Sequence, residues 1–237
     1  MPNPSSLIPP LKSIGLIGGM GWEASAVYYQ RINQIIHAEL KNMASADILM
    51  HSLNNRLPAQ LMYRNQWDEL AKLLIDSAKK LERASAQCIA LACNSVHHVA
   101  EQIEQEIDIP LLHIADAVAQ EAKQRKHSKL CLLGTKFTCQ MDFYKDRLEL
   151  YDLDLTTPDK ADIDRIHKII YQKLKTGVFD SQAHSDFTKV CEKLKEENDG
   201  LILACTELPL LLKSDSPQIY DTIELHSQMI AKFSLED

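Results

Sequence analysis

Short apolar runs alternate along the chain with longer segments in which apolar residues recur every three or four positions. The short runs are typical of buried strands, and the longer periodicity is typical of amphipathic helices. We expect strands at 13–18, 47–51, 87–92, 110–114, 129–133, 200–204 and 217–220, and helices at 22–40, 67–84, 95–107, 116–126, 160–175 and 182–197. Because the two kinds of segment alternate, the sequence predicts an α/β fold with mostly parallel sheets covered by helices.

The same order of signals occurs twice along the chain. The first copy reads IGLIGGMG, IALACNS and IPLLHIAD, and the second reads LCLLGTKF, LILACTE and SPQIYD. A glycine at the end of the opening strand precedes the cysteine by 75 residues in the first copy and by 71 in the second. We therefore expect two similar doubly wound lobes, residues 1–115 with 221–237 and residues 116–220, related by a pseudo-twofold axis with the functional site between them.

Composition and charge narrow the class of protein. The 237 residues are 45% hydrophobic, which is sufficient for a packed interior, and the net charge of −7 is spread without a Lys/Arg block. A basic surface for nucleic acid is therefore not expected. The first residues lack the pattern of a signal peptide, and no stretch approaches 18 uninterrupted apolar residues. We expect a cytoplasmic protein that does not interact with a membrane.

The six cysteines show neither a CxxC motif nor the spacing of a zinc site, and a cytoplasmic location predicts free thiols. No metal is expected. We interpret Cys88, Cys131, Cys139 and Cys191, inside predicted strands or helices, as buried structural residues.

Cys93 and Cys205 differ from the other four because each ends an apolar strand and precedes a small polar residue and a predicted helix. A helix N-terminus stabilises anions, so it lowers the pKa of a thiol and also binds a carboxylate. Racemisation removes a proton from one face of Cα and delivers one to the opposite face. A thiolate and a thiol that face each other across a substrate are sufficient for this reaction.

These segments resemble those of the cofactor-independent aspartate/glutamate racemase superfamily. The resemblance rests on IALACNSVHH and LILACTELPLLL, supported by IGLIGGMGWEAS, LLGTKFTCQMDFYKDRL and TPDKADIDRIHKIIYQKLKTG, and it spans nearly the whole chain. It implies catalysis by Cys93 and Cys205 without pyridoxal phosphate or another cofactor, a site between two lobes, a small amino-acid substrate and a homodimer.

The resemblance also implies substrate-binding residues. Asn94, Ser95 and Thr206 match residues that bind the substrate carboxylate, and Thr135 lies at the equivalent turn of the second copy. Lys175 matches a lysine that binds the side-chain carboxylate in aspartate-selective relatives. An exposed cation at a helix end explains Lys175 equally well.

The loop NNRLPAQLMYR departs from the family pattern. Aspartate-selective relatives have Asp-Arg after the proline, whereas Ala59 and Gln60 follow Pro58 here. The group that binds the side chain is therefore open among Gln60, Arg56, Arg64 and Lys175, and acceptance of several amino acids remains an alternative.

Three further motifs allow other interpretations. Gly19-x-Gly21-x-x-Ala24 matches a dinucleotide-binding fingerprint, but no acidic residue ends the second predicted strand, so we expect these glycines and Met20 to line an amino-acid site. His97 would support a Cys93 thiolate by a hydrogen bond or be an ordinary satisfied histidine. Glu207 is interpreted as an anion in a first helical turn rather than a general base.

Other functions remain as alternatives. A hydantoin racemase or a maleate isomerase would use the same pair of cysteines on other small carbonyl or carboxylate compounds. A non-catalytic amino-acid-binding module would need the lobes but not two thiols. A cysteine hydrolase would need a single nucleophile with an orienting His and Asn.

Overall fold

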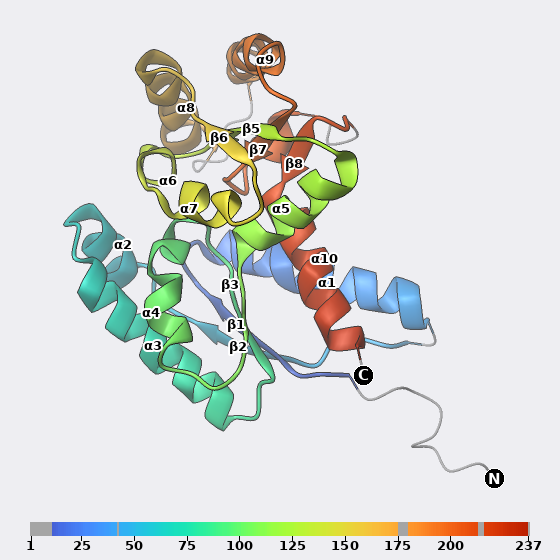
Figure 1. Ribbon diagram of the computed structural model, residues 1–237. Coiled ribbons are helices and arrows are strands. Elements are labelled where there is room, and N and C mark those ends of the chain that lie inside the picture. Colours follow the sequence, from blue (N-terminus) through green and yellow to red (C-terminus); the bar gives the residue numbers. More distant parts are fainter. Residues whose placement is uncertain (1–10, 42, 175–179, 213–215, 237) are drawn as a thin grey trace. The chain divides into compact units, whose positions relative to one another are not determined.

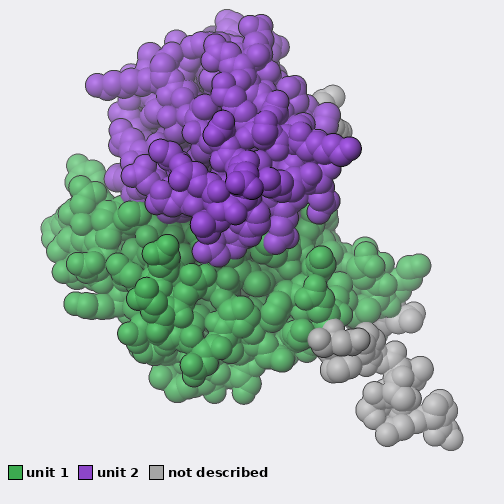
Figure 2. Space-filling view, in the orientation of Figure 1, with its two compact units in different colours: residues 1–113, 226–237 green, residues 114–225 purple. Residues whose placement is uncertain are grey.

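The computed structural model describes residues 11–41, 43–174, 180–212 and 216–236, and the chain forms two compact units. Unit 1 comprises residues 1–113 and 226–237, and unit 2 comprises residues 114–225 (Figure 2). The boundaries expected from the sequence, at 115/116 and 220/221, fall a few residues away from these positions. Unit 2 is therefore one continuous segment, whereas unit 1 is assembled from two segments.

Unit 1 contains a parallel sheet with the strand order β2-β1-β3-β4. The strands are β1 (Ile14–Gly18), β2 (Ile48–Ser52), β3 (Cys88–Leu91) and β4 (Leu111–Leu112). β1 and β3 are fully buried, as expected for central strands that read as continuous apolar runs. In the register, Ile14 pairs with Cys88 and Ile17 pairs with Leu91.

The helices of unit 1 are α1 (Trp22–Leu40), α2 (Arg56–Tyr63), α3 (Trp67–Arg83) and α4 (Ala100–Glu104), together with the 3-10 helix η2 (Ser95–Val99) and most of α10 (Thr222–Leu235). α3 and α4 cover one face of the sheet, and α1 and α10 cover the other (Figure 1). Acidic residues in the first turn of α3 and basic residues in its last turn suit the helix dipole. Its apolar face buries Leu70, Leu74 and Leu81 against the sheet.

Unit 2 repeats this arrangement with the strand order β6-β5-β7-β8, again all parallel. Its strands are β5 (Lys129–Leu133), β6 (Asp154–Thr156), β7 (Gly200–Leu203) and β8 (Ile219–Asp221). Its helices are α5 (Ile114–Arg125), α6 (Lys136–Gln140), α7 (Phe143–Glu149), α8 (Lys160–Gln172), α9 (Ser181–Lys195) and the 3-10 helix η4 (Leu208–Leu211). α8 and α9 lie on one face of the sheet, and α5 and α7 lie on the other (Figure 1).

The structure confirms the predicted α/β class with two parallel sheets, and it adds one strand. β6 was not predicted, because its three residues Asp-Leu-Thr do not form an apolar run. Among the described strands it pairs with β5 alone and lies at the edge of the sheet. None of its three residues is buried, so it does not require an apolar run. Among the described helices, none is both long and apolar enough to cross a lipid bilayer.

The turn after β1 depends on Gly19, which has a φ of +88°. A Cβ atom at this position would collide with the backbone of Leu53, the residue that follows β2. Leu53 N–H donates a 2.9 Å hydrogen bond to the Gly18 carbonyl. The pairing of β1 with β2 therefore brings the backbones of Gly19 and Leu53 close together. The Gly19 N–H donates in turn to Ser25 Oγ of α1 at 2.8 Å.

Replacing Gly19 should therefore be costly. We expect Gly19→Ala to lower the free energy of unfolding by about 2 kcal/mol or more, because the left-handed conformation and the collision both oppose a side chain. Gly134→Ala is the matched control, because Gly134 follows β5 as Gly19 follows β1, and an added Cβ would meet its nearest atoms at an ordinary 3.4 Å. Urea unfolding of both variants tests the expectation, and equal stabilities would contradict it.

Candidate active site

The first candidate residue follows β3 at the carboxyl edge of the unit 1 sheet. The Ala92 N–H donates to the Ile17 carbonyl at 2.9 Å, so pairing with β1 continues to the residue before Cys93. β1 leads to α1 on one face of the sheet, and β3 leads to η2 and α4 on the opposite face (Figure 1). Ligands of open α/β sheets bind in the crevice where neighbouring strands diverge in this way. Cys93, half-buried, stands at this position together with the buried Met20 after β1.

The second candidate residue occupies the same position in unit 2. Leu133 of β5 pairs with Leu203 of β7, and the Ala204 N–H donates to the Leu133 carbonyl at 2.8 Å. Each cysteine is thus two residues beyond the last pair of the two middle strands in its own sheet. The turn that follows β5, with Gly134 and Thr135, corresponds to the glycine turn that follows β1.

The chain after each cysteine differs from the sequence expectation. Both turns lead into short 3-10 helices, η2 of five residues and η4 of four, instead of regular α-helices. The predicted helix at 95–107 is η2 followed by the five-residue α4. A helix dipole requires several aligned α-helical turns, so it contributes less to thiolate stability here than the sequence suggested.

Direct contacts replace the helix dipole at Cys205. Its Sγ donates to Glu207 Oε2 at 2.9 Å, and Thr206 Oγ1 donates to the same oxygen at 2.6 Å. The sequence interpretation of Glu207 missed this contact. Residues two apart do not face each other on a helix, whereas the compact turn between β7 and η4 brings their side chains together. A carboxylate that accepts from a thiol is suited to take its proton.

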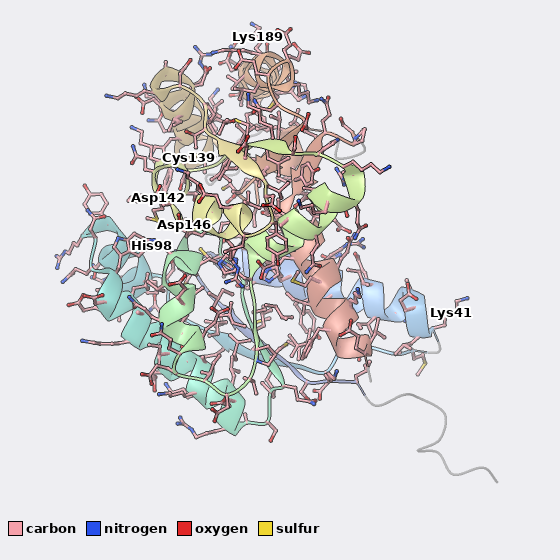
Figure 3. The ribbon with its side chains drawn as sticks, in the orientation of Figure 1. Lys41, His98, Cys139, Asp142, Asp146 and Lys189 are labelled. Atoms are coloured by element: carbon pink, nitrogen blue, oxygen red, sulfur yellow. The ribbon has the colours of Figure 1, made fainter. Side chains whose placement is uncertain are left out.

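Near Cys93, His97 contacts the backbone instead of the sulfur. Its Nδ1 lies 2.9 Å from the Cys93 carbonyl and 3.2 Å from the Asn94 carbonyl. The neighbouring His98, labelled in Figure 3, is exposed. Its ring packs edge-on against Trp67 of α3, with ring centroids 4.7 Å apart. Within the described part of the chain, no group of three or more His, Cys, Asp or Glu side chains is placed to hold a metal ion.

The remaining predicted site residues have varied surroundings. Asn94 is buried and precedes η2 without a side-chain capping bond, and Ser95 is half-buried as the first residue of η2. Thr135 is buried, and its Oγ1 accepts from the Thr138 N–H at 3.3 Å, which caps α6. Thr206 is half-buried beside Cys205, Gln60 is exposed on α2, and Lys175 lies outside the described residues. Their binding roles stay predictions.

The other four cysteines lie inside strands or helices, as expected: Cys88 in β3, Cys131 in β5, Cys139 in α6 and Cys191 in α9. Loss of hydration raises the pKa of Cys131 to about 11 and the pKa of Cys88, Cys139 and Cys191 to about 12. These thiols are therefore protonated at neutral pH, which agrees with a structural role.

The family of the chain follows from its similarity to known proteins. A family model for Asp/Glu/Hydantoin racemases matches residues 17–230. The chain belongs to this family. The expected enzyme class, an isomerase of the aspartate/glutamate racemase type, is thereby confirmed.

Solved structures and one curated relative agree with this membership. A candidate Asp/Glu racemase from Yersinia pestis has 36% identity and a TM-score of 0.91, and the match covers 95% of this chain and 100% of that one. An aspartate racemase homologue from Pyrococcus horikoshii has 32% identity and a TM-score of 0.84 at the same coverage. A broad specificity amino-acid racemase of Bacillus subtilis is 27% identical over 203 residues, 84% of this chain and 87% of that protein.

The burial of the thiols predicts an order of reactivity. With iodoacetamide at pH 8, we expect Cys93 to be modified first, because among the six cysteines only Cys93 and Cys139 are partly exposed and loss of hydration raises the pKa of Cys139. Cys88, Cys131, Cys139 and Cys191 should stay unmodified, because on the order of one thiol in a thousand or fewer is ionised when the pKa is 11 to 12. Peptide mass spectrometry measures this, with urea-unfolded protein as the control. Modification of any of the four as fast as Cys93 would contradict the expectation.

Proposed function

We propose that this chain is an amino-acid racemase that acts on aspartate and glutamate, accepts further amino acids, and uses Cys93 and Cys205 as its two bases. The observation that carries the proposal is the equivalent position of these cysteines. Each lies two residues beyond the last pair of the middle strands, where ligands of parallel sheets bind. A structural cysteine would need no such position, and the other four cysteines do not share it.

The chemistry requires one thiolate and one thiol. The thiolate takes the Cα proton of the substrate and becomes a thiol, and the electron pair of the broken C–H bond passes to the substrate carboxylate. The second cysteine donates its thiol proton to the opposite face of Cα and is left as the thiolate. Racemisation in the other direction exchanges these roles, so the enzyme needs no net oxidant, reductant or cofactor.

Glu207 supplies a proton acceptor for Cys205. When Cys205 acts as the base, its thiol proton passes along the 2.9 Å contact to Glu207 Oε2, which releases it to solvent, and the remaining thiolate takes the Cα proton. When Cys205 acts as the acid, its thiol proton passes to Cα and the sulfur is left as the thiolate. The 2.6 Å hydrogen bond from Thr206 holds the carboxylate in place.

Binding of the substrate is assigned to neutral donors near the two cysteines. Asn94, Ser95, Thr135 and Thr206 provide amide and hydroxyl groups for the α-carboxylate, where hydrogen bonds also stabilise the charge that develops during proton removal. Met20 lines the site beside Cys93 from the turn after β1. These assignments are part of the proposal, as are a cytoplasmic location and a homodimer.

The breadth of the proposed substrate range rests on α2 and the residues just before it. Gln60 stands where aspartate-selective relatives have arginine, and its exposed carboxamide binds both charged and neutral side chains. Lys175 is the second proposed side-chain contact. A relative described as a broad specificity amino-acid racemase supports this breadth. A family that includes hydantoin racemases makes hydantoins the second candidate substrates.

Isotope exchange tests the reaction. Incubated in D₂O without pyridoxal phosphate, the purified protein should convert L-aspartate, L-glutamate or other single enantiomers into deuterated racemates, as followed by chiral chromatography and mass spectrometry. Cys93→Ala and Cys205→Ala should each lower kcat by about 1,000-fold, with residual exchange from one face only, because one of the two bases is lost. Cys139→Ala is the matched control and should remain active.

Two results would refute this proposal. Full activity of either single variant would exclude the two-base assignment. Exchange with hydantoins but with no amino acid would move the activity to the second candidate substrates.

Glu207 offers a separate prediction. Glu207→Gln keeps the size of the side chain but removes the proton acceptor, so we expect kcat to fall about 100-fold at pH 7. Activity should rise toward alkaline pH, because hydroxide then removes the thiol proton that Glu207 would otherwise accept. Glu192→Gln, on the exposed side of α9, is the control. An unchanged pH profile of kcat would show that Glu207 does not accept the proton.

A further inference from the structure

His97 lies at the turn that carries Cys93, and it contacts the backbone of this turn. Its imidazole is 2% exposed, and its Nδ1 lies 2.9 Å from the Cys93 carbonyl oxygen and 3.2 Å from the Asn94 carbonyl oxygen. Carbonyl oxygens only accept hydrogen bonds, so Nδ1 must carry the proton. One side chain thereby holds two consecutive carbonyls of the turn.

The segment that follows Cys93 leads directly into a short helix. Asn94 occupies the position before η2 but makes no side-chain capping bond to it, and η2 is a 3-10 helix of five residues. The bifurcated hydrogen bond from His97 Nδ1 to the carbonyls of Cys93 and Asn94 fixes the backbone of this turn.

The surroundings of His97 select its neutral form. The rings of His113 and His226 lie edge-on to it, at centroid distances of 4.7 Å and 5.8 Å. His226 is itself held by the Tyr28 hydroxyl at 2.9 Å and by the Leu112 carbonyl at 2.7 Å. Burial is the main cause that lowers the pKa of His97 well below its ordinary value, and the nearby His113 and His226 lower it further. The buried Nε2 makes no hydrogen bond in the described structure, so one tautomer is fixed by Nδ1 alone.

We infer that His97 is a positioning residue, which sets the direction of the Cys93 thiol by donating its Nδ1 proton to the carbonyls of Cys93 and Asn94. The inference deepens the proposed function and rests on it, because the direction of the sulfur matters only if the sulfur meets a substrate. Rotation of the peptide group of Cys93 would change the direction of its Cα–Cβ bond and thereby displace the sulfur. Proton transfer tolerates displacements of only about 0.5 Å in a catalytic group.

Two substitutions distinguish the effect of the hydrogen-bond donor at Nδ1 from the effect of the imidazole ring. In His97→Asn the amide nitrogen reaches about the position of Nδ1 and still donates to the two carbonyls, whereas His97→Leu has similar bulk and no donor. We expect His97→Leu to lower kcat for aspartate racemisation about 10- to 100-fold, with a smaller change in KM, because the sulfur is displaced while the groups proposed for binding remain. His97→Asn should restore most of kcat.

A second measurement does not depend on activity. The rate of Cys93 alkylation by iodoacetamide, measured by peptide mass spectrometry on the native full chain, should change several-fold in His97→Leu and return in His97→Asn. Cys205, in the other unit, serves as the internal reference and should not change. His98→Leu is the matched control, because this adjacent histidine is exposed and its ring packs against Trp67 of α3.

Each result decides the inference. Wild-type kcat and Cys93 reactivity in His97→Leu would overturn it, as would equal losses in His97→Asn and His97→Leu, because the ring and not the donor would then matter. If His97→Leu does not fold, His97→Gln replaces it, since its amide is displaced toward the position of Nε2. An inactive wild-type protein whose Cys93 reactivity still follows the Nδ1 donor would refute the proposed racemase and leave the positioning role intact.

Discussion

Main-chain pairing between the two middle strands of each sheet determines where the chemistry of this protein is located. β1 and β3 run side by side and then lead to helices on opposite faces, and β5 and β7 run side by side in unit 2. The backbone must separate at that point, so the residues just beyond the last hydrogen bond line a crevice. Cys93 and Cys205 stand there because pairing ends at Ala92 and Ala204. A slip of one residue in either register would turn the sulfur to the other face of the strand.

The six thiols illustrate how the environment changes one functional group. Cys88, Cys131 and Cys191 are buried and Cys139 is partly buried, and loss of hydration raises the pKa of each of these four thiols. The two in the turns are placed against polar groups instead. Cys205 is bonded to a carboxylate, and the backbone of Cys93 is bonded to an imidazole. Neither contact requires a long helix, which explains why two short 3-10 helices are sufficient next to the cysteines.

Most of the fold could be read from the sequence because central parallel strands are apolar throughout and α3 has a clear amphipathic period. β6 could not, since an edge strand of three residues carries too little apolar surface to be distinguished from a loop. The positions of Cys93 and Cys205 at strand ends were predictable from where the apolar runs stop. The contact of Glu207 with Cys205 and the bond from His97 to the Cys93 carbonyl were not, because both depend on the exact path of a turn. Sequence spacing specifies neighbours on a regular helix or strand but not within an irregular turn.

The division of the chain has a consequence for biosynthesis. Unit 2 is continuous, so all of its residues have been synthesised once position 225 is reached. Unit 1 is not: its first 113 residues are complete much earlier, but they lack the part of α10 that supplies His226 to Tyr28 and Ser234 to Lys12. During vectorial synthesis the second unit can thus mature first, while the earlier-made half of unit 1 waits with an unfilled face on its sheet. Unit 1 is therefore complete only when α10 packs beside α1 on this face of the sheet.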